Sequence, residues 1–199
     1  MKMLHRRTLL VAGSALAATP AMGQAPDPRM AERSVGSASA PMTVQEFFSL
    51  TCSHCGAFHR DTWPRVKAEL VDTGRIRMVW RDFPLDQVSL RAHAVARAFP
   101  AERYDAFISA LFATQDRWAY ARGVDHKAEI GKIAAVAGMS GAAFEAAWAD
   151  DDLARAILAQ RQAGEQEFRI QATPTFVFNR RVVSGNIPFD RFAREAQTP

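Results

Sequence analysis

Two cysteines lie two residues apart in the stretch FFSLTCSHCGAFH, residues 47–59, and the chain has no others. Such a pair can be a structural disulfide, part of a metal site or a redox-active dithiol. A disulfide across two residues would constrain the unfolded chain little, because the entropic gain falls with loop length. A zinc site needs about four ligands, so His59, His93 and His126 would have to converge on the pair from separate segments. The pattern therefore favours a redox dithiol and leaves the other two uses open.

The expected helix position determines the chemistry of this dithiol. If a helix begins near Cys52, that sulfur faces unpaired backbone N–H groups and the positive end of the helix dipole, which stabilise a thiolate. Cys55 would lie about one turn further in and act as the resolving partner. His54 lies beside both sulfurs and would favour the Cys52 thiolate further when protonated or donating an N–H. The alternative for His54 is a solvated loop residue without such a role.

The segments around the pair predict a small mixed sheet. MTVQEFFSL, residues 42–50, is aromatic and branched and predicts a strand that leads into the cysteines. RIRMVWRDF, residues 75–83, alternates apolar residues with arginines and predicts a second strand. TPTFVFNRRVVSG, residues 173–185, predicts a β-hairpin with its turn at Asn179-Arg180. A short helix from Pro188 to Ala196 is expected to follow.

Apolar residues at helical spacing fill most of the remaining chain. FHRDTWPRVKAEL, residues 58–70, predicts a helix after the cysteines, kinked at Pro64 because proline removes a backbone donor. From residue 85 to residue 164 the spacing is helical throughout, with breaks at glycines, prolines and aspartates. The sequence thus predicts an α/β fold into which an all-helical domain is inserted.

The N-terminal residues predict export from the cytosol. MKMLHRRTLLVAGSALAATPAMGQA has a basic start, an apolar run and small residues ahead of Gln24, as a secretory signal peptide does. We therefore predict a cleaved signal peptide over residues 1–23, with an uncleaved anchor as the alternative. Arg6-Arg7 resembles a twin-arginine signal, although His5 stands where that pattern has Ser or Thr, so the export route stays open. Export would place the dithiol in an oxidising compartment, the periplasm.

The changes in pattern also predict the domain boundaries. Residues 24–41 are rich in Pro, Ser, Ala and Gly without an apolar period, and they predict a flexible arm. Residues 42–84 and 165–199 would form one α/β domain, and residues 85–164 the inserted helical domain.

The charge balance excludes one class of partner. The chain has 25 Lys and Arg against 21 Asp and Glu. Lys2, Arg6 and Arg7 lie in the predicted leader, so the balance after cleavage is 22 against 21. A nearly neutral mature chain gives no reason to expect nucleic acid or an anionic membrane as a partner.

Two motifs together resemble a known family. EFFSLTCSHC, with Glu46 six positions ahead of Cys52, resembles the active-site region of the DsbA-like thiol:disulfide oxidoreductases, members of the thioredoxin fold. Thr173-Pro174 is similar to the second marker of that family, a cis-proline opposite the dithiol, preceded by a residue whose backbone takes part in substrate binding. RDFPL, the helical insert and FNRRVVSGNIPFDRF follow in the family's order. Ser53 departs from the best-known members, which have proline there, and this departure leaves the redox potential open.

The resemblance implies a fold and an activity. It implies a thioredoxin-like fold with an inserted all-helical domain, and a periplasmic enzyme that donates its Cys52–Cys55 disulfide to reduced exported proteins through a mixed disulfide. It implies that Glu46 accepts or relays the proton of Cys55; the alternative is a glutamate that is paired, or near a sheet edge in water. A quinone-linked membrane partner would reoxidise the dithiol, with no organic cofactor and no metal. Isomerases of this group carry a dimerisation domain ahead of the thioredoxin part, and residues 24–41 are too few for one, so a monomer is expected.

Two other functions remain open. A periplasmic reductant that serves cytochrome or copper-site maturation would use the same motif at a lower potential. A Cu(I) carrier could bind the ion with Cys52 and Cys55 alone, since two thiolates suffice for a soft ion. Such carriers often add methionine ligands, and none of the four methionines after the leader lies near the pair in sequence.

Overall fold

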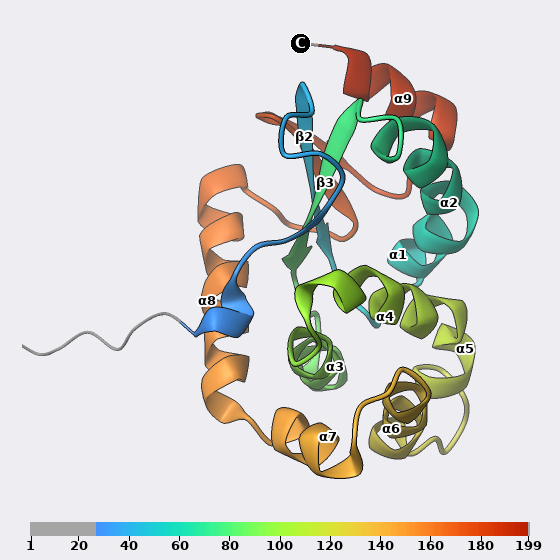
Figure 1. Ribbon diagram of the computed structural model, residues 1–199, viewed down its shortest axis with the longest axis vertical. Coiled ribbons are helices and arrows are strands. Elements are labelled where there is room, and N and C mark those ends of the chain that lie inside the picture. The colour runs from blue at the N-terminus through green and yellow to red at the C-terminus, as the bar shows by residue number, and fades with distance from the viewer. Residues whose placement is uncertain (1–26, 199) are drawn as a thin grey trace, which may run out of the picture.

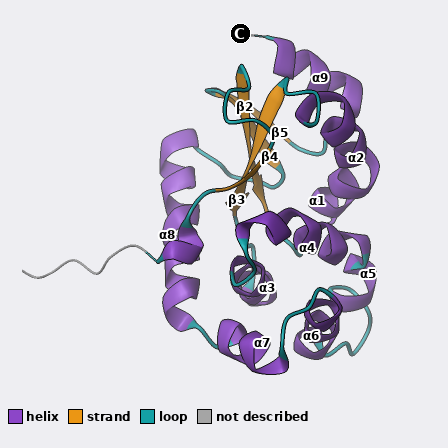
Figure 2. Cartoon of the chain, viewed as in Figure 1, coloured by secondary structure: helices purple, strands orange, loops and turns teal. Residues whose placement is uncertain are grey.

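A computed structural model describes residues 27–198, in which a mixed five-stranded sheet lies between helices (Figures 1 and 2). The strand order is β1 (Arg33–Val35), β3 (Ile76–Asp82), β2 (Met42–Phe48), β4 (Thr175–Phe178) and β5 (Arg181–Ser184). Strands β2 and β3 are parallel, and the other neighbouring pairs are antiparallel. The central strand β2 therefore ends at the residues that lead into the cysteines. The predicted signal peptide over residues 1–23 lies outside the described residues.

The helices follow the predicted order along the chain. They are α1 (Ser53–Ala57), α2 (Trp63–Val66), α3 (Gln87–Arg97), α4 (Ala101–Ala113), α5 (Gln115–Trp118), α6 (His126–Val136), α7 (Gly141–Trp148), α8 (Asp151–Phe168) and α9 (Phe189–Gln197). The helix after the cysteines continues through Pro64, with π-helical turns at Phe58–Thr62 and Lys67–Val71 on either side of α2. None of the helices within residues 27–198 is long and apolar enough to span a membrane.

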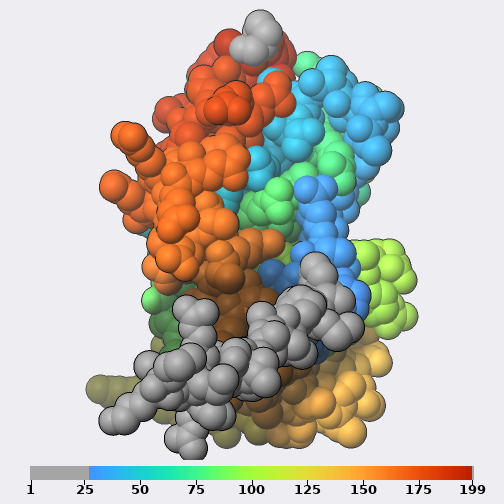
Figure 3. Space-filling model, turned by 90° about the vertical axis from the view of Figure 1, so that its left-hand side faces the viewer, coloured from blue at the N-terminus to red at the C-terminus, as the bar shows by residue number. Residues whose placement is uncertain are grey.

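Alternate residues of β2 point to two layers of helices. Phe48 belongs to the larger core, which it shares with Phe58 and Trp63 on the side of α1, α2 and α9. Phe47 points the other way and packs against Phe168 of α8, with 5.8 Å between ring centroids. A Cβ at Gly164 would lie 2.4 Å from the Phe47 ring, so glycine is required for α8 to lie this close to the sheet. Figure 3 shows the face that α8 covers, with α8 among the orange residues.

The helices α3 to α7 form a block at one end of the sheet (Figure 1). This block corresponds to the insert predicted over residues 85–164. The predicted boundary at residue 164 falls inside α8, because this helix continues to Phe168 while it packs along β3. The predicted hairpin of residues 173–185 is confirmed as β4 and β5, with Asn179 at φ 53° in the turn.

The prediction of a flexible arm over residues 24–41 is wrong for residues 27–41. Pro28–Met30 form a 3₁₀ turn, and β1 pairs with β3 as an edge strand. Arg33 is buried, and its Nη2 donates to the carbonyl oxygen of Arg97 at 3.1 Å. A three-residue strand held by backbone pairing leaves no apolar period in the sequence, so the composition alone could not reveal it.

A buried ionic cluster joins the end of β3 to α3 and α4. Asp82 accepts hydrogen bonds from Arg97 Nε at 2.5 Å and from the Tyr104 hydroxyl at 2.6 Å, and His93 Nδ1 lies 2.9 Å from its carboxylate. Burial opposes ionisation of Asp82, but the charge of Arg97 and the contacts with His93 and Tyr104 outweigh it and hold the pKa of the carboxyl below its usual range. This cluster fixes the helical block to the sheet.

Replacing Arg97 with methionine should therefore destabilise the fold. The substitution leaves Asp82 buried without its cationic partner, and we expect the free energy of unfolding at pH 7 to fall by about 3 to 5 kcal/mol. Urea denaturation measures this change. Arg155→Met is the matched control, because Arg155 pairs with Asp152 at the exposed surface and should change the value by less than about 1 kcal/mol. If Arg97→Met lowers the free energy of unfolding no more than Arg155→Met does, the buried cluster contributes no stability.

Candidate active site

The two cysteines lie where β2 passes into α1. Cys52 is the N-cap residue of α1, with extended backbone angles of φ −82° and ψ 120°, and Cys55 lies within the first turn. Both are free thiols. Cys52 is 9% exposed, whereas Cys55 is fully buried. Cys52 is therefore the sulfur of the pair that an incoming thiol can reach.

The surroundings move the pKa values of the two thiols in opposite directions. A hydrogen bond from the Cys55 side chain lowers the pKa of Cys52 to about 5 against the effect of burial, and the backbone N–H groups of Cys55 and His54 add to this shift. Burial raises the pKa of Cys55 well above its ordinary value, and the charges of Cys52 and Glu46 raise it further. At neutral pH the reduced pair thus carries one thiolate, at the accessible sulfur.

The peptide bond Thr173-Pro174 is cis, which confirms the prediction. It lies opposite the dithiol, since the Cys52 thiol donates to the carbonyl oxygen of Thr173 at 3.3 Å. The Thr175 hydroxyl donates to the Ala172 carbonyl at 2.7 Å, and the Gly185 N–H donates to the Pro174 carbonyl at 2.8 Å. The start of the hairpin thus holds a backbone carbonyl directly beside the Cys52 sulfur.

Glu46 and His59 form a buried pair on the inner side of the site. Glu46 is fully buried on β2, and its Oε2 lies 3.2 Å from His59 Nε2. The His59 ring stacks on Phe112, with 4.2 Å between ring centroids. The other carboxylate oxygen, Oε1, has no hydrogen-bond partner in the described part of the chain. Because its negative charge raises the pKa of Cys55, Glu46 is electrostatically coupled to the Cys55 thiol.

His54 lies at the surface, on the first turn of α1. Its backbone N–H contributes to the lowered pKa of Cys52. The further contribution that the sequence predicts for the imidazole ring of His54 stays a prediction.

The loop ahead of Cys52 is anchored by the start of α3. The Ser89 hydroxyl accepts the N–H of Leu50 at 3.1 Å and lies 2.8 Å from the Ser49 hydroxyl. Asp86 accepts from the Thr51 hydroxyl at 2.6 Å with one oxygen and caps α3 through the N–H of Ser89 with the other. The same residues that begin α3 therefore fix the residues before the dithiol.

His59 is a site residue that the sequence offers only as a ligand for the zinc alternative, although it lies buried beside Glu46. A signal was present, because His59 follows Cys55 by four residues, and residues four apart share one helix face. A helix that turns Cys55 inward therefore also turns His59 inward. Asp86 and Ser89, which anchor the loop ahead of Cys52, are far from it in sequence, so no local spacing could have predicted their contacts.

The histidines that a zinc site would need lie in separate surroundings. His59 pairs with Glu46, His93 lies beside Asp82, and His126 Nδ1 lies 2.7 Å from the Trp118 carbonyl oxygen. Within residues 27–198, no group of three or more His, Cys, Asp or Glu side chains is placed to hold a metal ion. The zinc alternative therefore has no support in the described residues.

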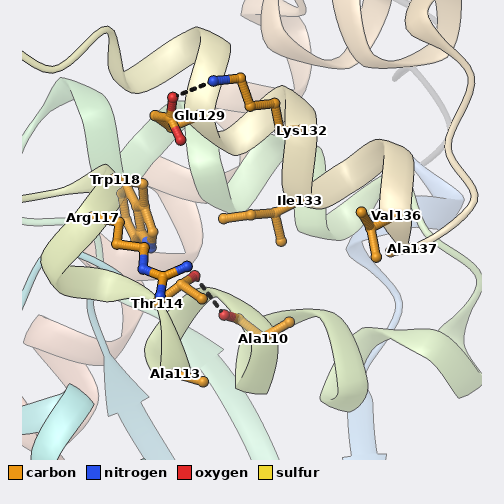
Figure 4. A pocket seen from close by; sticks show the side chains of 10 residues that line it. All are labelled: Ala110, Ala113, Thr114, Arg117, Trp118, Glu129, Lys132, Ile133, Val136 and Ala137. Carbon is orange, nitrogen blue, oxygen red and sulfur yellow. Dashed lines mark hydrogen bonds and ion pairs between the residues drawn. The ribbon is translucent and has the colours of Figure 1, made fainter.

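A separate hollow lies in the helical block between α4 and α6 (Figure 4). Its volume is about 560 Å³, and its walls are mainly apolar side chains, with Arg117, Glu129 and Lys132 among the lining residues. None of the residues predicted for the dithiol site lines it.

Comparisons with known proteins agree with this geometry. The family model described as thioredoxin matches residues 29–195. A crystal structure of Wolbachia pipientis alpha-DsbA1 superposes with a TM-score of 0.78 at 28% identity, over 86% of this chain and 90% of that one. The crystal structure of Chlamydia trachomatis DsbA, at 18% identity and a TM-score of 0.73, covers 89% of this chain and 95% of its own and supports the fold alone. The predicted thioredoxin-like α/β fold is thus confirmed.

Curated relatives extend the comparison in sequence. A Rickettsia typhi protein named as a protein-disulfide oxidoreductase is 26% identical over 80% of this chain, and the match spans 58% of that relative. The thiol:disulfide interchange protein DsbA of Salmonella typhimurium is 28% identical over 68% of this chain and 65% of its own. The chain thus spans less than two thirds of the length of both relatives.

The lowered pKa of Cys52 can be tested by titration. Thiolate absorbance at 240 nm in the reduced protein should rise with a midpoint near pH 5. Cys55→Ala removes the largest cause of the shift, so the midpoint should move upward. His54→Ala keeps the backbone N–H and removes only the imidazole, so a rise in this variant would confirm the role predicted for the ring. A wild-type midpoint near the ordinary thiol value of about 8.5 would contradict the proposed stabilisation.

Proposed function

Because the chain belongs to the thioredoxin family and shares the fold of its DsbA-like members, we propose that it is a thiol:disulfide oxidoreductase that donates its Cys52–Cys55 disulfide to reduced exported proteins. The observation that carries the proposal is the opposite shift of two adjacent thiols beside a cis-proline. A stabilised Cys52 thiolate favours the reduced form of the pair, and a protein that favours its reduced form gives its disulfide away.

The proposed reaction is two successive thiol–disulfide exchanges. A substrate thiolate attacks Cys52 Sγ, the Cys52–Cys55 bond breaks, and Cys55 leaves as a thiolate that takes up a proton. The resulting mixed disulfide joins the substrate to Cys52. A second substrate thiolate attacks the substrate sulfur of this bond and releases Cys52 as the stabilised thiolate. The substrate loses two electrons and gains a disulfide, and the enzyme is left as the dithiol.

The Thr173 carbonyl is suited to hold the substrate backbone during this exchange. The Cys52 sulfur lies 3.3 Å from this carbonyl oxygen, which accepts from the sulfur only while Cys52 is a protonated thiol. Neither the thiolate nor a mixed disulfide at Cys52 carries that proton, so in both states the carbonyl is free to accept an N–H from an extended substrate, as in strand addition. Leu85 and Tyr120 are exposed apolar side chains that adjoin the loop before Cys52, and they would contact apolar residues of an unfolded substrate.

Glu46 is proposed to exchange the proton of Cys55. The first step releases Cys55 into a site where its thiolate is strongly disfavoured, so a proton must reach it. Glu46 is the buried carboxyl coupled to that sulfur, and His59 is its partner. A proton held between these two side chains would reach Cys55 without entry of bulk water.

The setting and the partners of the enzyme are part of the proposal. We place it in the periplasm, where its substrates would be newly exported reduced proteins and where a quinone-linked membrane oxidase would restore the disulfide. The similarity to the thiol:disulfide interchange protein DsbA of Salmonella typhimurium supports the periplasmic setting. We propose that the enzyme works as a monomer.

Replacing Cys52 with serine should abolish oxidation of a reduced model peptide, because the attacked sulfur is gone. Cys55→Ser should instead trap mixed disulfides when the protein acts on a disulfide substrate, because the sulfur that releases them is missing. Peptide fluorescence follows the first reaction, and nonreducing electrophoresis follows the second. Retained turnover in Cys52→Ser would refute the proposed role of this residue.

The reduction potential decides the direction of the reaction. Equilibration of the protein in graded glutathione buffers should place the pair well above the thioredoxin value of about −270 mV, toward the value of about −120 mV for DsbA. A potential near the thioredoxin value would instead identify a periplasmic reductant that uses the same residues.

Replacing Glu46 with glutamine should slow the first exchange. The amide keeps the size of the side chain but cannot carry the proton, so we expect the rate of mixed-disulfide formation to fall at least about tenfold at pH 7. The midpoint of the Cys52 titration should change much less. Stopped-flow measurement of the oxidised protein with a single-thiol peptide isolates this step. Asp116→Asn in the helical block is a control for loss of one acidic group, and an equal effect in that variant would exclude the proton-transfer role.

A further inference from the structure

We propose that Gln115 and Tyr120 of the helical block are positioning residues that clamp the loop Leu50–Cys52 and thereby stabilise the Cys52 thiolate. This inference rests on the proposed function, because it assigns the helical block a part in setting the strength of the same dithiol. It stands on hydrogen bonds that connect two parts of the chain separated by more than sixty residues.

Gln115 holds two carbonyl groups of the loop at once. Its Nε2 donates to the Leu50 carbonyl at 2.7 Å and to the Cys52 carbonyl at 3.0 Å. The side chain is 1% exposed, so water does not compete for these bonds. The amide orientation follows from the partners, since both neighbouring groups are acceptors and only the NH₂ end can donate to them.

Tyr120 holds the carbonyl between these two. Its hydroxyl donates to the Thr51 carbonyl at 2.5 Å, while the residue stays 48% exposed at the protein surface. Three successive carbonyls ahead of α1 thus accept side-chain hydrogen bonds from one segment, residues 115–120. Burial raises the pKa of Tyr120, and the negative charge of Cys52 adds to this effect, which places the phenol within the field of the thiolate.

Gly56 provides the room for this clamp. A Cβ at Gly56 would lie 2.2 Å from Gln115 Oε1 and 2.8 Å from Arg60 Nη1. Any side chain at position 56 would therefore displace Gln115. The same Gln115 oxygen is buried without a hydrogen-bond partner in the described part of the chain, which costs free energy of folding. The two hydrogen bonds from the NH₂ end of Gln115 to the loop offset this cost.

The clamp segment is itself fixed to the neighbouring helices. Trp118 Nε1 donates to the Leu111 carbonyl at 2.7 Å. On the side of the dithiol, Arg60 Nη1 donates to the Phe112 carbonyl at 3.1 Å. Trp118 is thus tied to the end of α4, and the end of α4 is tied to Arg60 in the helix that follows the cysteines, which limits the movement of Gln115 and Tyr120 relative to the sulfur.

The clamp favours the thiolate for two reasons. Carbonyl oxygens beside an anionic sulfur repel it, and donors bonded to those oxygens offset part of their negative charge at low dielectric. The clamp also fixes the extended backbone at Cys52, which aims its sulfur at the N–H groups of His54 and Cys55. Loss of either donor should therefore raise the pKa of Cys52 and make the protein a weaker oxidant.

The test compares Tyr120→Phe, Gln115→Met and Gly56→Ala with the wild type. Each variant should shift the 240 nm thiolate titration upward by about half a unit to one unit, on the scale of a single hydrogen bond. The equilibrium constant with glutathione should move toward the oxidised protein by about three- to tenfold. Thr114→Val is the matched control, because the Thr114 hydroxyl donates to Ala110 within α4 and does not reach the loop (Figure 4).

Thermal unfolding of each reduced variant separates positioning from loss of fold. Tyr120 is half exposed, so Tyr120→Phe should fold even if Gln115→Met does not. In that case the thiolate titration of Tyr120→Phe alone tests the clamp. A midpoint in Tyr120→Phe equal to that of the wild type and of Thr114→Val would overturn the proposal. The titration needs no substrate. A wild type that oxidises no peptide would therefore refute the proposed function and leave this test unaffected, and a functional wild type with unshifted variants would refute the clamp alone.

Discussion

A thiolate held at Cys52 is the constraint on which the rest of the structure depends. Cys52 is only 9% exposed, so a charge on its sulfur has little water around it and must be stabilised by protein donors. The N-cap position supplies backbone N–H groups, and Cys55 supplies a side-chain donor. These donors come from one helical turn, and the turn is placed by β2, by the cis-proline loop and by the helical block together. A change in any of these elements is therefore expected to reach the sulfur.

Two buried ionic groups on either side of Phe48 support this arrangement. Its ring lies 6.1 Å from His59, which pairs with Glu46, and 4.9 Å from His93, which lies beside Asp82. The two groups differ in how completely they are satisfied. Both oxygens of Asp82 are paired, whereas Glu46 Oε1 has no partner in the described residues. A fully paired carboxylate fits a structural role, and a partly paired one beside a thiol fits a role in proton exchange.

The sequence predicted strands β2 to β5, the order of the helices and the cysteine pair, because each of these has a local pattern. Aromatic and branched residues marked β2, alternation marked β3, turn residues marked the hairpin around Asn179, and CxxC spacing marked the dithiol. Elements without such a pattern were missed. Strand β1 has three residues and is held by backbone pairing, and Gln115 meets the loop only after a separation of 63 residues from Cys52. The cis bond at Pro174 could be predicted from family resemblance and not from the local residues.

Because the pKa values of the two thiols shift in opposite directions, the two steps of the proposed exchange differ in whether the leaving sulfur needs a proton. A low pKa makes Cys52 a good leaving group, so the second step needs no proton. A raised pKa makes Cys55 a poor leaving group, so the first step is slow unless a proton arrives as the bond breaks. A buried carboxyl lowers the stability of the fold, and under the proposed mechanism its benefit lies in supplying the proton for the first step. This need for a proton is the physical reason for the proposed role of Glu46, which lies on the central strand, is coupled to Cys55 and is paired with His59.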